Sequence, residues 1–255
     1  MRARAAVSAH RCGGRTVLSE LSSEPPWGLR PVPGGVAMVG TAAGPVGGDE
    51  LALRVEVGPG ADLTLEAVAA TIVWPGRDGT ASRTTAAVTV GAGGRLRWIG
   101  RPLVSVAGST HAQETTVELA GDARLNLVEE MALGRSEEPP GRLTSRLRVV
   151  RDGLPLLDHR PSIDPAAPGH HTTAGTGGHR HLLQQVIVGT ADDQSTTRVL
   201  PDAAAARFAL GEGVVLRVAS GRTRPAALTA PAALDDDEGD RGHHSGAPIT
   251  ASGSR

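Results

Sequence analysis

The sequence predicts a mostly β protein, in which repeated hairpins form coiled or solenoid-like mixed sheets with one or two short helices. The first observation is repetition, because three segments follow one eleven-residue template: residues 55–65, 88–98 and 117–127. Each copy has apolar residues at positions one, three, nine and eleven, with small, Gly or Asp residues between them. The second observation is composition: the 255 residues include one Phe and no Tyr. The core must therefore consist of Val, Leu, Ile and Ala, which pack well in sheets.

The template predicts a local strand, turn and strand. Alternating apolar residues mark a strand with one buried face, and the central Gly, Pro or Asp cluster marks a reversal, so we interpret each copy as a β-hairpin. The copies start 33 and 29 residues apart, and a weaker fourth copy, residues 147–157, carries Asp152-Gly153 as its turn. Such spacing indicates stacked repeats. The alternative is that hairpin sequences simply recur in β proteins.

The remaining elements follow in chain order. Residues 1–35 contain one plausible strand, RTVLSELSS, followed by a segment rich in Pro and Gly, so the organised part is expected to start after it. The Gly47-Gly48-Asp49 segment leads into an alternating strand instead of a helix. A phosphate loop needs a helix N-terminus, so this segment is predicted to be a tight turn. Residues 127–141 lose alternation and predict a short helical turn or an irregular excursion.

The second half of the chain changes character. A turn-rich, His-rich segment precedes a strand at residues 182–190, and the Ala-rich residues 201–213 predict a helix of about two turns before a last strand. We expect one β-rich domain over residues 1–222 and a disordered acidic, His-containing tail over residues 223–255.

Charge and residue usage exclude several functions. All 26 basic residues are Arg, so a Walker-type phosphate loop, a Schiff-base enzyme and a carbamylated-lysine metal centre are excluded. The formal net charge of −1 provides no general attraction to nucleic acid or membrane. One cysteine, Cys12, excludes an internal disulfide or a Cys-based zinc site. Without a signal-peptide core or a long apolar stretch, a cytoplasmic protein is expected.

Histidines give a separate signal. His170, His171, His179 and His181 form two close pairs, and paired imidazoles in a flexible loop can bind Ni²⁺, Zn²⁺ or Cu²⁺ reversibly. A His-rich protein that itself holds nickel or zinc is therefore an alternative function. Polar linkers also carry histidines that bind nothing specific.

Enzymatic and nucleic-acid functions have weaker support. Ser109 near His111 and Asp158 beside His159 are fragments of nucleophile or base pairs, but none lies in a G-x-S-x-G turn. We predict no enzymatic activity. The arginines at 95, 97 and 101 come without aromatic residues for stacking, which favours a solvated sheet face or a docking surface for an acidic partner over nucleic-acid binding.

Several motifs in order resemble the urease accessory protein family UreD, also called UreH. GGDELALRVEVGPGADLTL resembles its opening motif, and the following VAATIVW carries Ala70 and Thr71 in matching places. GGRLRWIGRPLV resembles the second hairpin, and VELAGDARLNLVEEMALGR resembles the third. The resemblance covers roughly residues 40–160. Departures at Ile72, Pro75 and Val128 mark a divergent member.

The resemblance implies a non-enzymatic scaffold with a largely β, superhelical fold. Such proteins act with a UreF-like helical protein and a UreG-like GTPase to deliver nickel to apo-urease. No cofactor would be bound permanently, and Ni²⁺ would pass in transit through weak, exchangeable ligands. The family-motif or passage candidates are Gly47, Gly48, Asp49, Ala70, Thr71, Glu129, Gly134 and Arg135.

Glu129 is the favoured passage residue among the carboxylates, which also include Glu66 and Glu130. The alternative for each is a solvated carboxylate at a strand edge. Arg135 could equally be a buried partner of one of them.

Overall fold

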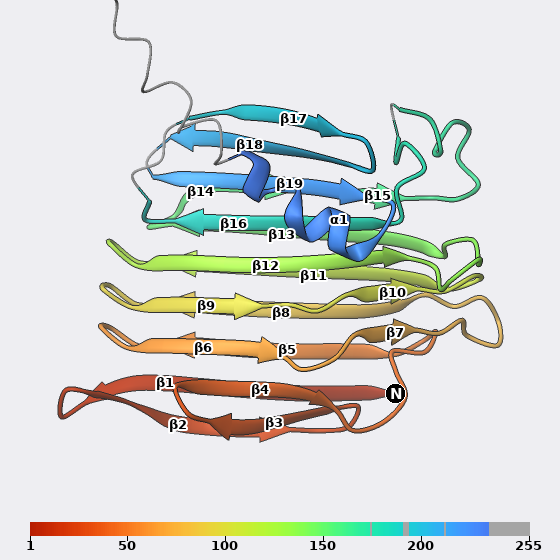
Figure 1. Ribbon diagram of the computed structural model, residues 1–255. Coiled ribbons are helices and arrows are strands. Elements are labelled where there is room, and N and C mark those ends of the chain that lie inside the picture. Colours follow the sequence, from red (N-terminus) through yellow and green to blue (C-terminus); the bar gives the residue numbers. More distant parts are fainter. Residues whose placement is uncertain (174, 191–193, 212, 235–255) are drawn as a thin grey trace, which may run out of the picture.

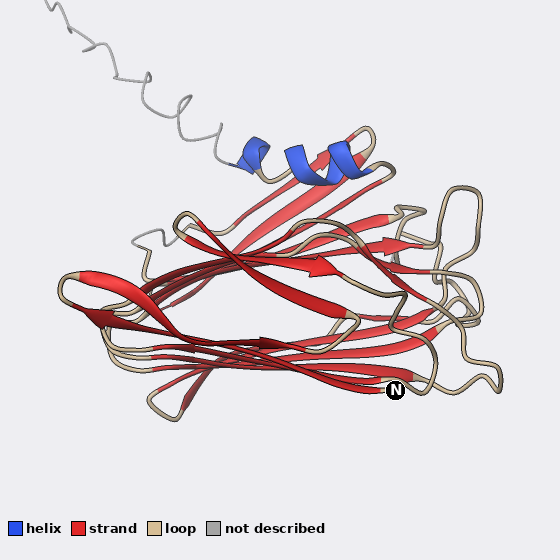
Figure 2. Ribbon diagram, turned by 90° about the horizontal axis from the view of Figure 1, so that it is seen from below, coloured by secondary structure: helices blue, strands red, loops and turns tan. Residues whose placement is uncertain are grey.

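The computed structural model describes residues 1–173, 175–190, 194–211 and 213–234, which form two β-sheets packed face to face (Figures 1 and 2). Within these residues, sheet A contains β1 (Arg2–Cys12), β2 (Arg15–Ser23), β5 (Glu50–Val57), β8 (Ser82–Val90), β11 (Thr110–Leu119), β13 (Arg142–Arg151), β14 (Leu154–His159) and β15 (Ser162–Ile163). Their order is β14-β13-β11-β8-β5-β1-β2, with β15 beside β13.

Sheet B is the larger layer. Its described strands are β3 (Trp27–Val32), β4 (Gly35–Gly40), β6 (Asp62–Ala67), β7 (Thr71–Val73), β9 (Arg95–Ile99), β10 (Leu103–Ser105), β12 (Arg124–Leu133), β16 (His181–Val188), β17 (Thr196–Leu200), β18 (Ala203–Gly211) and β19 (Val214–Gly221). Their order is β17-β18-β19-β16-β12-β9-β6-β4-β3, with β7 and β10 forming a short ladder beside β12. The mostly β, solenoid-like architecture with mixed sheets is therefore confirmed.

The three template copies stack in register, but they are not hairpins. In each copy the first strand lies in sheet A and the second in sheet B, so the central turn is a corner between sheets; these corners stack at the left of Figure 1. Val55, Val88 and Val117 are neighbours across parallel strands of sheet A. The hairpin prediction is wrong here because a hairpin turn and a sheet-to-sheet corner use the same Gly and Asp residues.

The fourth copy is a true hairpin. β13 and β14 pair antiparallel around Asp152 and Gly153, whose φ angles are 49° and 83°. Two successive residues with positive φ are what a tight turn between twisted antiparallel strands requires. This hairpin closes sheet A at one edge.

The N-terminal segment is more ordered than the sequence indicated. β1 begins at Arg2 and pairs with β5 in parallel and with β2 antiparallel, so the organised fold starts with the first strand. The inward face of β1 consists largely of alanines, namely Ala3, Ala5 and Ala9 with Val7. Small residues give a weak alternation, and for this reason the strand was missed.

The Ala-rich segment predicted to be helical is strand β18. It lies between β17 and β19, and its residues Ala203 and Ala205 are buried beneath Ala230 and Leu234. Alanine favours a helix locally, but its small side chain also allows a helix to approach the sheet closely, and tertiary packing prevails. Residues 127–133, expected to be irregular, likewise continue β12.

Two short helices follow the last strand, in agreement with the predicted number but not the predicted place. α1 (Arg224–Thr229) begins after Thr223, whose hydroxyl accepts a hydrogen bond from the Ala226 N–H, and η1 (Ala232–Leu234) follows it. Both cover the outer face of sheet B at its upper end in Figure 1. The disorder predicted from residue 223 is thus wrong up to residue 234, and residues 235–255 lie outside the described part. The described residues contain no helix long and apolar enough to span a membrane.

Truncation should distinguish these helices from the rest of the tail. Removing residues 223–255 should destabilise the protein by about 3 kcal/mol, because Glu130 loses its bidentate partner Arg224 and Leu183 loses its cover. Removing only residues 235–255 should leave the free energy of unfolding unchanged. Urea denaturation of both truncations measures the difference, and equal stabilities would contradict the structural role of α1 and η1.

Candidate functional site

The interior between the sheets is divided into an apolar half and a polar half. Near the stacked corners it is filled by residues such as Val88, Val117 and Leu125. Toward the loops, β11 places His111 and Thr115 on the same inward face. Polar residues at inward positions of an alternating strand are the sequence signal for a polar interior.

The centre of the polar half is an interior polar cluster of Thr115, Glu129, Ser145, His159 and Gln184. β12 directs Glu129 inward, where its Oε1 accepts a hydrogen bond from the Thr115 hydroxyl at 2.7 Å and its Oε2 accepts one from the Ser145 hydroxyl at 3.4 Å. The Gln184 amide N–H also donates to the Glu129 Oε2 atom. The Gln184 Oε1 atom lies 2.8 Å from the His159 Nδ1 atom. Side chains from β11, β13 and β16 thus donate hydrogen bonds to one carboxylate of β12.

Burial raises the pKa of the Glu129 carboxyl above its ordinary value, although hydrogen bonds from Thr115 and Gln184 act in the opposite direction. Among the described residues, no arginine or histidine forms an ion pair with it. A buried carboxylate without a cationic partner is stabilised either by a proton or by a cation. Glu129 is therefore suited to exchange one for the other.

Two cavities meet this cluster. One, of about 110 Å³, is lined by Glu129 and Thr115 together with Thr71 and Arg101. The second, of about 290 Å³, is lined by Gln184 and His159 and by apolar residues of β16, β18 and β19. Thr115 and Glu129 therefore line the first cavity, and His159 and Gln184 line the second. The hydrogen bond between Gln184 and Glu129 connects the two pairs.

The neighbouring carboxylate points the other way. Glu130 lies on the outer face of sheet B, where its two oxygens accept hydrogen bonds from Arg224 at 2.8 and 3.0 Å. Glu66 pairs with Arg101 at 2.8 Å. These carboxylates have cationic partners within the protein, whereas Glu129 has none in the described structure.

The Gly47-Gly48-Asp49 segment is a tight turn that enters β5, as the sequence predicted. Gly48 has φ +87°. A Cβ on Gly47 would lie 2.3 Å from the Thr80 carbonyl oxygen, so backbone contact requires glycine there. The Asp49 carboxylate accepts a hydrogen bond from the Val46 N–H at 2.8 Å and pairs with the Met1 ammonium at 2.7 Å. Both oxygens of Asp49 are occupied by the fold.

Ala70 and Thr71 lead into β7 and differ in placement. Thr71 pairs with Leu103 of β10 and lines the smaller cavity, whereas Ala70 is exposed. Trp74 follows β7, and its backbone exchanges hydrogen bonds with Pro45 and Gly47. The opening motif and the VAATIVW segment that follows it are therefore joined at the loop end of the fold.

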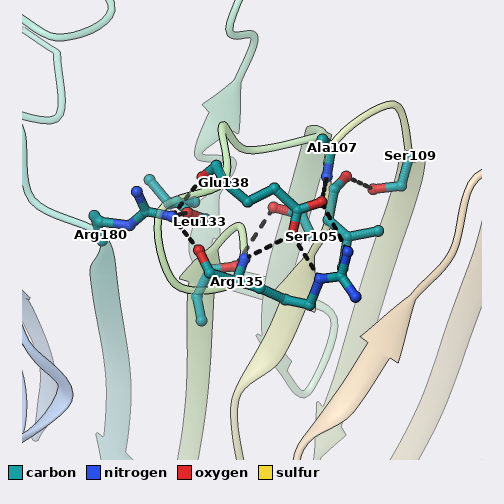
Figure 3. A network of polar contacts seen from close by, with 9 residues as sticks. Ser105, Ala107, Ser109, Leu133, Arg135, Glu138 and Arg180 are labelled. Atoms are coloured by element: carbon teal, nitrogen blue, oxygen red, sulfur yellow. Dashed lines mark hydrogen bonds and ion pairs between the residues drawn. The ribbon is translucent and has the colours of Figure 1, made fainter.

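Gly134 and Arg135 form a third part of the loop end (Figure 3). The Arg180 Nη2 atom donates to the carbonyl oxygens of Leu133, Arg135 and Glu138 at 2.9, 2.6 and 2.5 Å. Gly134 has φ +78°, and a Cβ there would lie 2.5 Å from the Glu138 carbonyl oxygen. This close approach explains why glycine occupies the position.

Arg135 is a brace for the loop end and not the buried partner of Glu129 or Glu130 that we had considered. Its Nε atom lies 2.6 Å from Glu138, and its guanidinium lies 5.4 Å from the centre of the Trp74 ring. The Arg135 side chain lowers the pKa of the Glu138 carboxyl to about 2. The opening motif and the end of the third motif thus meet around Trp74, and β12 connects this loop end to Glu129 of the interior polar cluster.

The four histidines do not form one site. The rings of His170 and His171 are in contact, with centroids 3.4 Å apart, while the His179 Nδ1 atom lies 2.7 Å from the Ser220 hydroxyl. His181 belongs to β16, and burial lowers its pKa. Within the described residues, no group of three or more His, Cys, Asp or Glu side chains is placed to hold a metal ion.

The fragments of nucleophile pairs have other partners. His111 lies 2.8 Å from Ser82 and not from Ser109, whose hydroxyl donates to the Val106 carbonyl. Burial lowers the pKa of His111 to about 4, so its imidazole is neutral at physiological pH. Ser82 is fully buried, which leaves no access for a substrate.

Sequence reasoning missed four residues of the site: Thr115, Ser145, Gln184 and Arg180. Gln184 interrupts the apolar alternation of LLQQVIVG, and this was the available signal. The contact of Gln184 with Glu129 spans 55 residues of sequence, so only the pairing of β12 with β16 creates it.

Comparison with known proteins agrees with this architecture. The family described as UreD urease accessory protein matches residues 1–234, well beyond the 40–160 expected from motifs. The urease accessory protein UreD of Streptomyces coelicolor is 40% identical over 214 residues, which is 80% of this chain and 84% of that protein. UreD 2 of Saccharopolyspora erythraea is 39% identical over 85% of this chain and 78% of its own length. UreD of Streptomyces avermitilis is 37% identical over 92% of both chains. The chain belongs to the UreD family of urease accessory proteins.

Proposed function

We propose that this protein is a cytoplasmic, non-enzymatic urease maturation factor that supports nickel insertion into apo-urease together with UreF-like and UreG-like accessory proteins. Membership of the UreD family supports a role in urease maturation. The chain has no lysine for a phosphate loop, so any GTP hydrolysis belongs to the UreG-like partner.

The observation that supports the proposal is the burial of Glu129 at one cavity, together with its hydrogen bond to Gln184, which lines a second cavity. An ion in transit needs ligands that bind weakly enough to release it, and oxygen ligands from a carboxylate and hydroxyls meet this need for a divalent cation. The Glu129 carboxyl, with its raised pKa, gives up a proton when the cation arrives and regains it when the cation leaves. Thr115 and Ser145 hold the carboxylate in place from sheet A.

Co-expression tests the proposal. The tagged chain is expressed with urease subunits and the UreF-like and UreG-like proteins of the same organism, and the co-purified proteins and the nickel content of urease are measured with and without the chain. We expect the accessory proteins and urease to co-purify and nickel loading to depend on the chain. Normal loading of urease in the absence of this chain would contradict the proposal.

The metal-holding alternative has its own test. The described histidines do not assemble around one point, so we expect the His170→Ala/His171→Ala variant to load urease as the wild type does. Nickel titration of the purified chain and the nickel content of co-expressed urease are the two measurements. If the variant lost both chain-bound nickel and urease loading, the histidine pair would be the functional metal site.

A further inference from the structure

The outer face of sheet B carries a basic groove that the nickel pathway does not use. Arg95 and Arg97 of β9 and Arg124 of β12 line a groove of about 340 Å³ near the stacked corners, and we call these three residues the arginine groove. The two strands are parallel neighbours, and Arg95 lies directly opposite Arg124. Arg97 lies opposite Asn126, which makes a hydrogen bond with Gln185.

The positive charge of this groove is largely uncompensated. Arg95 has Asp62 at 3.8 Å, and within the described residues neither Arg97 nor Arg124 has an ion pair or a side-chain hydrogen bond. Like charges directly opposite one another on neighbouring strands destabilise a sheet. The fold therefore retains an unfavourable arrangement, which an anionic ligand would relieve.

Sheet A shows the contrasting case. On its outer face Arg54 pairs with Glu20 and Glu56, and Arg146 pairs with Glu114 and Asp158. These two outward-facing arginines of sheet A each have two carboxylates beside them. The arginine groove departs from that pattern.

The two described helices of the protein do not cover the groove. α1 and η1 lie over β16, β18 and β19, away from β9 in Figure 1. Leu234 of η1 packs in one cluster with Leu183, which lies opposite Glu130 of β12. Glu130 is six residues, or about 20 Å, along β12 from Arg124.

The spacing of the groove indicates its ligand. Arg95 and Arg97 are alternate residues of one strand, about 6.6 Å apart, which is also the spacing of alternate side chains in an extended peptide. Guanidinium groups bind carboxylates through paired hydrogen bonds. The lining residues include no aromatic side chain on which nucleic-acid bases could stack.

We propose that the arginine groove is a docking site for an extended acidic segment of a partner protein, in which Asp or Glu residues alternate with other residues. Binding of the segment places one carboxylate at Arg97 and another between Arg95 and Arg124, and relieves their repulsion. The site stands independently of the proposed nickel transfer, because it lies on the outer face of sheet B while Glu129 lies inside.

A labelled peptide tests the docking site on the full chain. The probe is a fluorescein-labelled peptide with three Thr-Glu repeats, and anisotropy is measured at about 50 mM and about 300 mM salt. We expect binding that weakens at the higher salt and falls by about tenfold in the Arg97→Gln/Arg124→Gln variant. The Arg15→Gln/Arg77→Gln variant removes two exposed arginines elsewhere and should bind as the wild type does.

Three results would overturn the proposal. The groove variant could bind the peptide as tightly as the wild type, or a Thr-Gln peptide could bind as tightly as the Thr-Glu peptide. A single-stranded oligonucleotide that binds the groove more tightly than the peptide would assign it to nucleic acid instead. Thermal unfolding provides a further check, because removing opposed charges should leave the groove variant at least as stable as the wild type.

Discussion

The Glu129→Gln variant is expected to reduce the nickel content of co-expressed urease by about tenfold or more, since loss of supporting groups at metal sites already lowers metal affinity by about 10- to 100-fold. Glutamine has the shape of glutamate and can keep the Thr115 and Gln184 contacts, but it has no charge to exchange between a proton and a cation. The measurement is nickel per urease active site after purification, in cells supplied with equal nickel.

A matched control distinguishes loss of the Glu129 charge from loss of any one negative charge of the protein. Glu118→Gln changes an exposed carboxylate of β11 and should leave nickel loading unchanged. Both variants should co-purify with the accessory proteins. If Glu129→Gln loaded urease fully, a role for this carboxylate in transit would be ruled out, while the docking role of the chain would remain open to the co-purification test.

The same variant carries a pH-dependent signature in stability. Burial raises the Glu129 pKa in the folded state, so the folded protein binds a proton more tightly than the unfolded chain does. Stability from this group is fully present below its unfolded pKa and decreases as pH rises toward the folded pKa, by about 1.4 kcal/mol per unit of difference. The Tm of Glu129→Gln should therefore exceed that of the wild type by more at pH 7.5 than at pH 4.5. A constant difference would mean that Glu129 titrates normally.

The second large effect is expected at the glycine pair before β5. Gly47→Ala should destabilise the protein by about 3 kcal/mol, because its Cβ would lie 2.3 Å from the Thr80 carbonyl oxygen and 2.4 Å from the Gly76 backbone. Gly48→Ala should cost about 1 kcal/mol, because its φ of +87° is strained for alanine but its surroundings are open. Urea denaturation at a common m-value measures both.

The comparison of the two glycines discriminates between contact and backbone conformation. Equal losses for both variants would show that the close approach at Gly47 costs no more than the backbone strain at Gly48. A larger loss for Gly48→Ala would contradict the close approach of residues 47 and 76. With the expected order, the motif resembling the UreD opening is explained by packing of the loop end around Trp74 and requires no ligand.

The inward-facing positions of the strands could be predicted from the sequence because the same apolar pattern recurs in successive coils of the solenoid. The template predicted which residues face inward, and Leu63, Leu96 and Leu125 occupy equivalent buried positions in neighbouring strands. The template did not predict which strands pair, because a corner between two sheets and a hairpin turn use the same Gly and Asp residues. The prediction of a helix at β18 was also wrong. An Ala-rich segment favours a helix in isolation, but here it packs as a strand beneath η1.

The candidate site shows the same division. Glu129 was preferred from a motif, but neither its burial nor its lack of a cationic partner could be read from sequence. Gln184 contacts Glu129 across 55 residues of sequence, and His159 contacts Gln184 in turn. The pairing of β12 with β16 creates the first of these contacts.

By itself the sequence determined the β class, the inward apolar positions, the turn at Gly47 and Gly48, and the exclusion of lysine chemistry. These follow from local periodicity, from backbone freedom at glycine and from residue counts. Only the tertiary structure decided which strands pair, that the buried Glu129 lines one cavity and is linked through Gln184 to a second, and that Arg95 lies opposite Arg124 in a groove with Arg97. Such contacts join residues far apart in the chain, and their energies depend on burial and neighbours that no local pattern specifies.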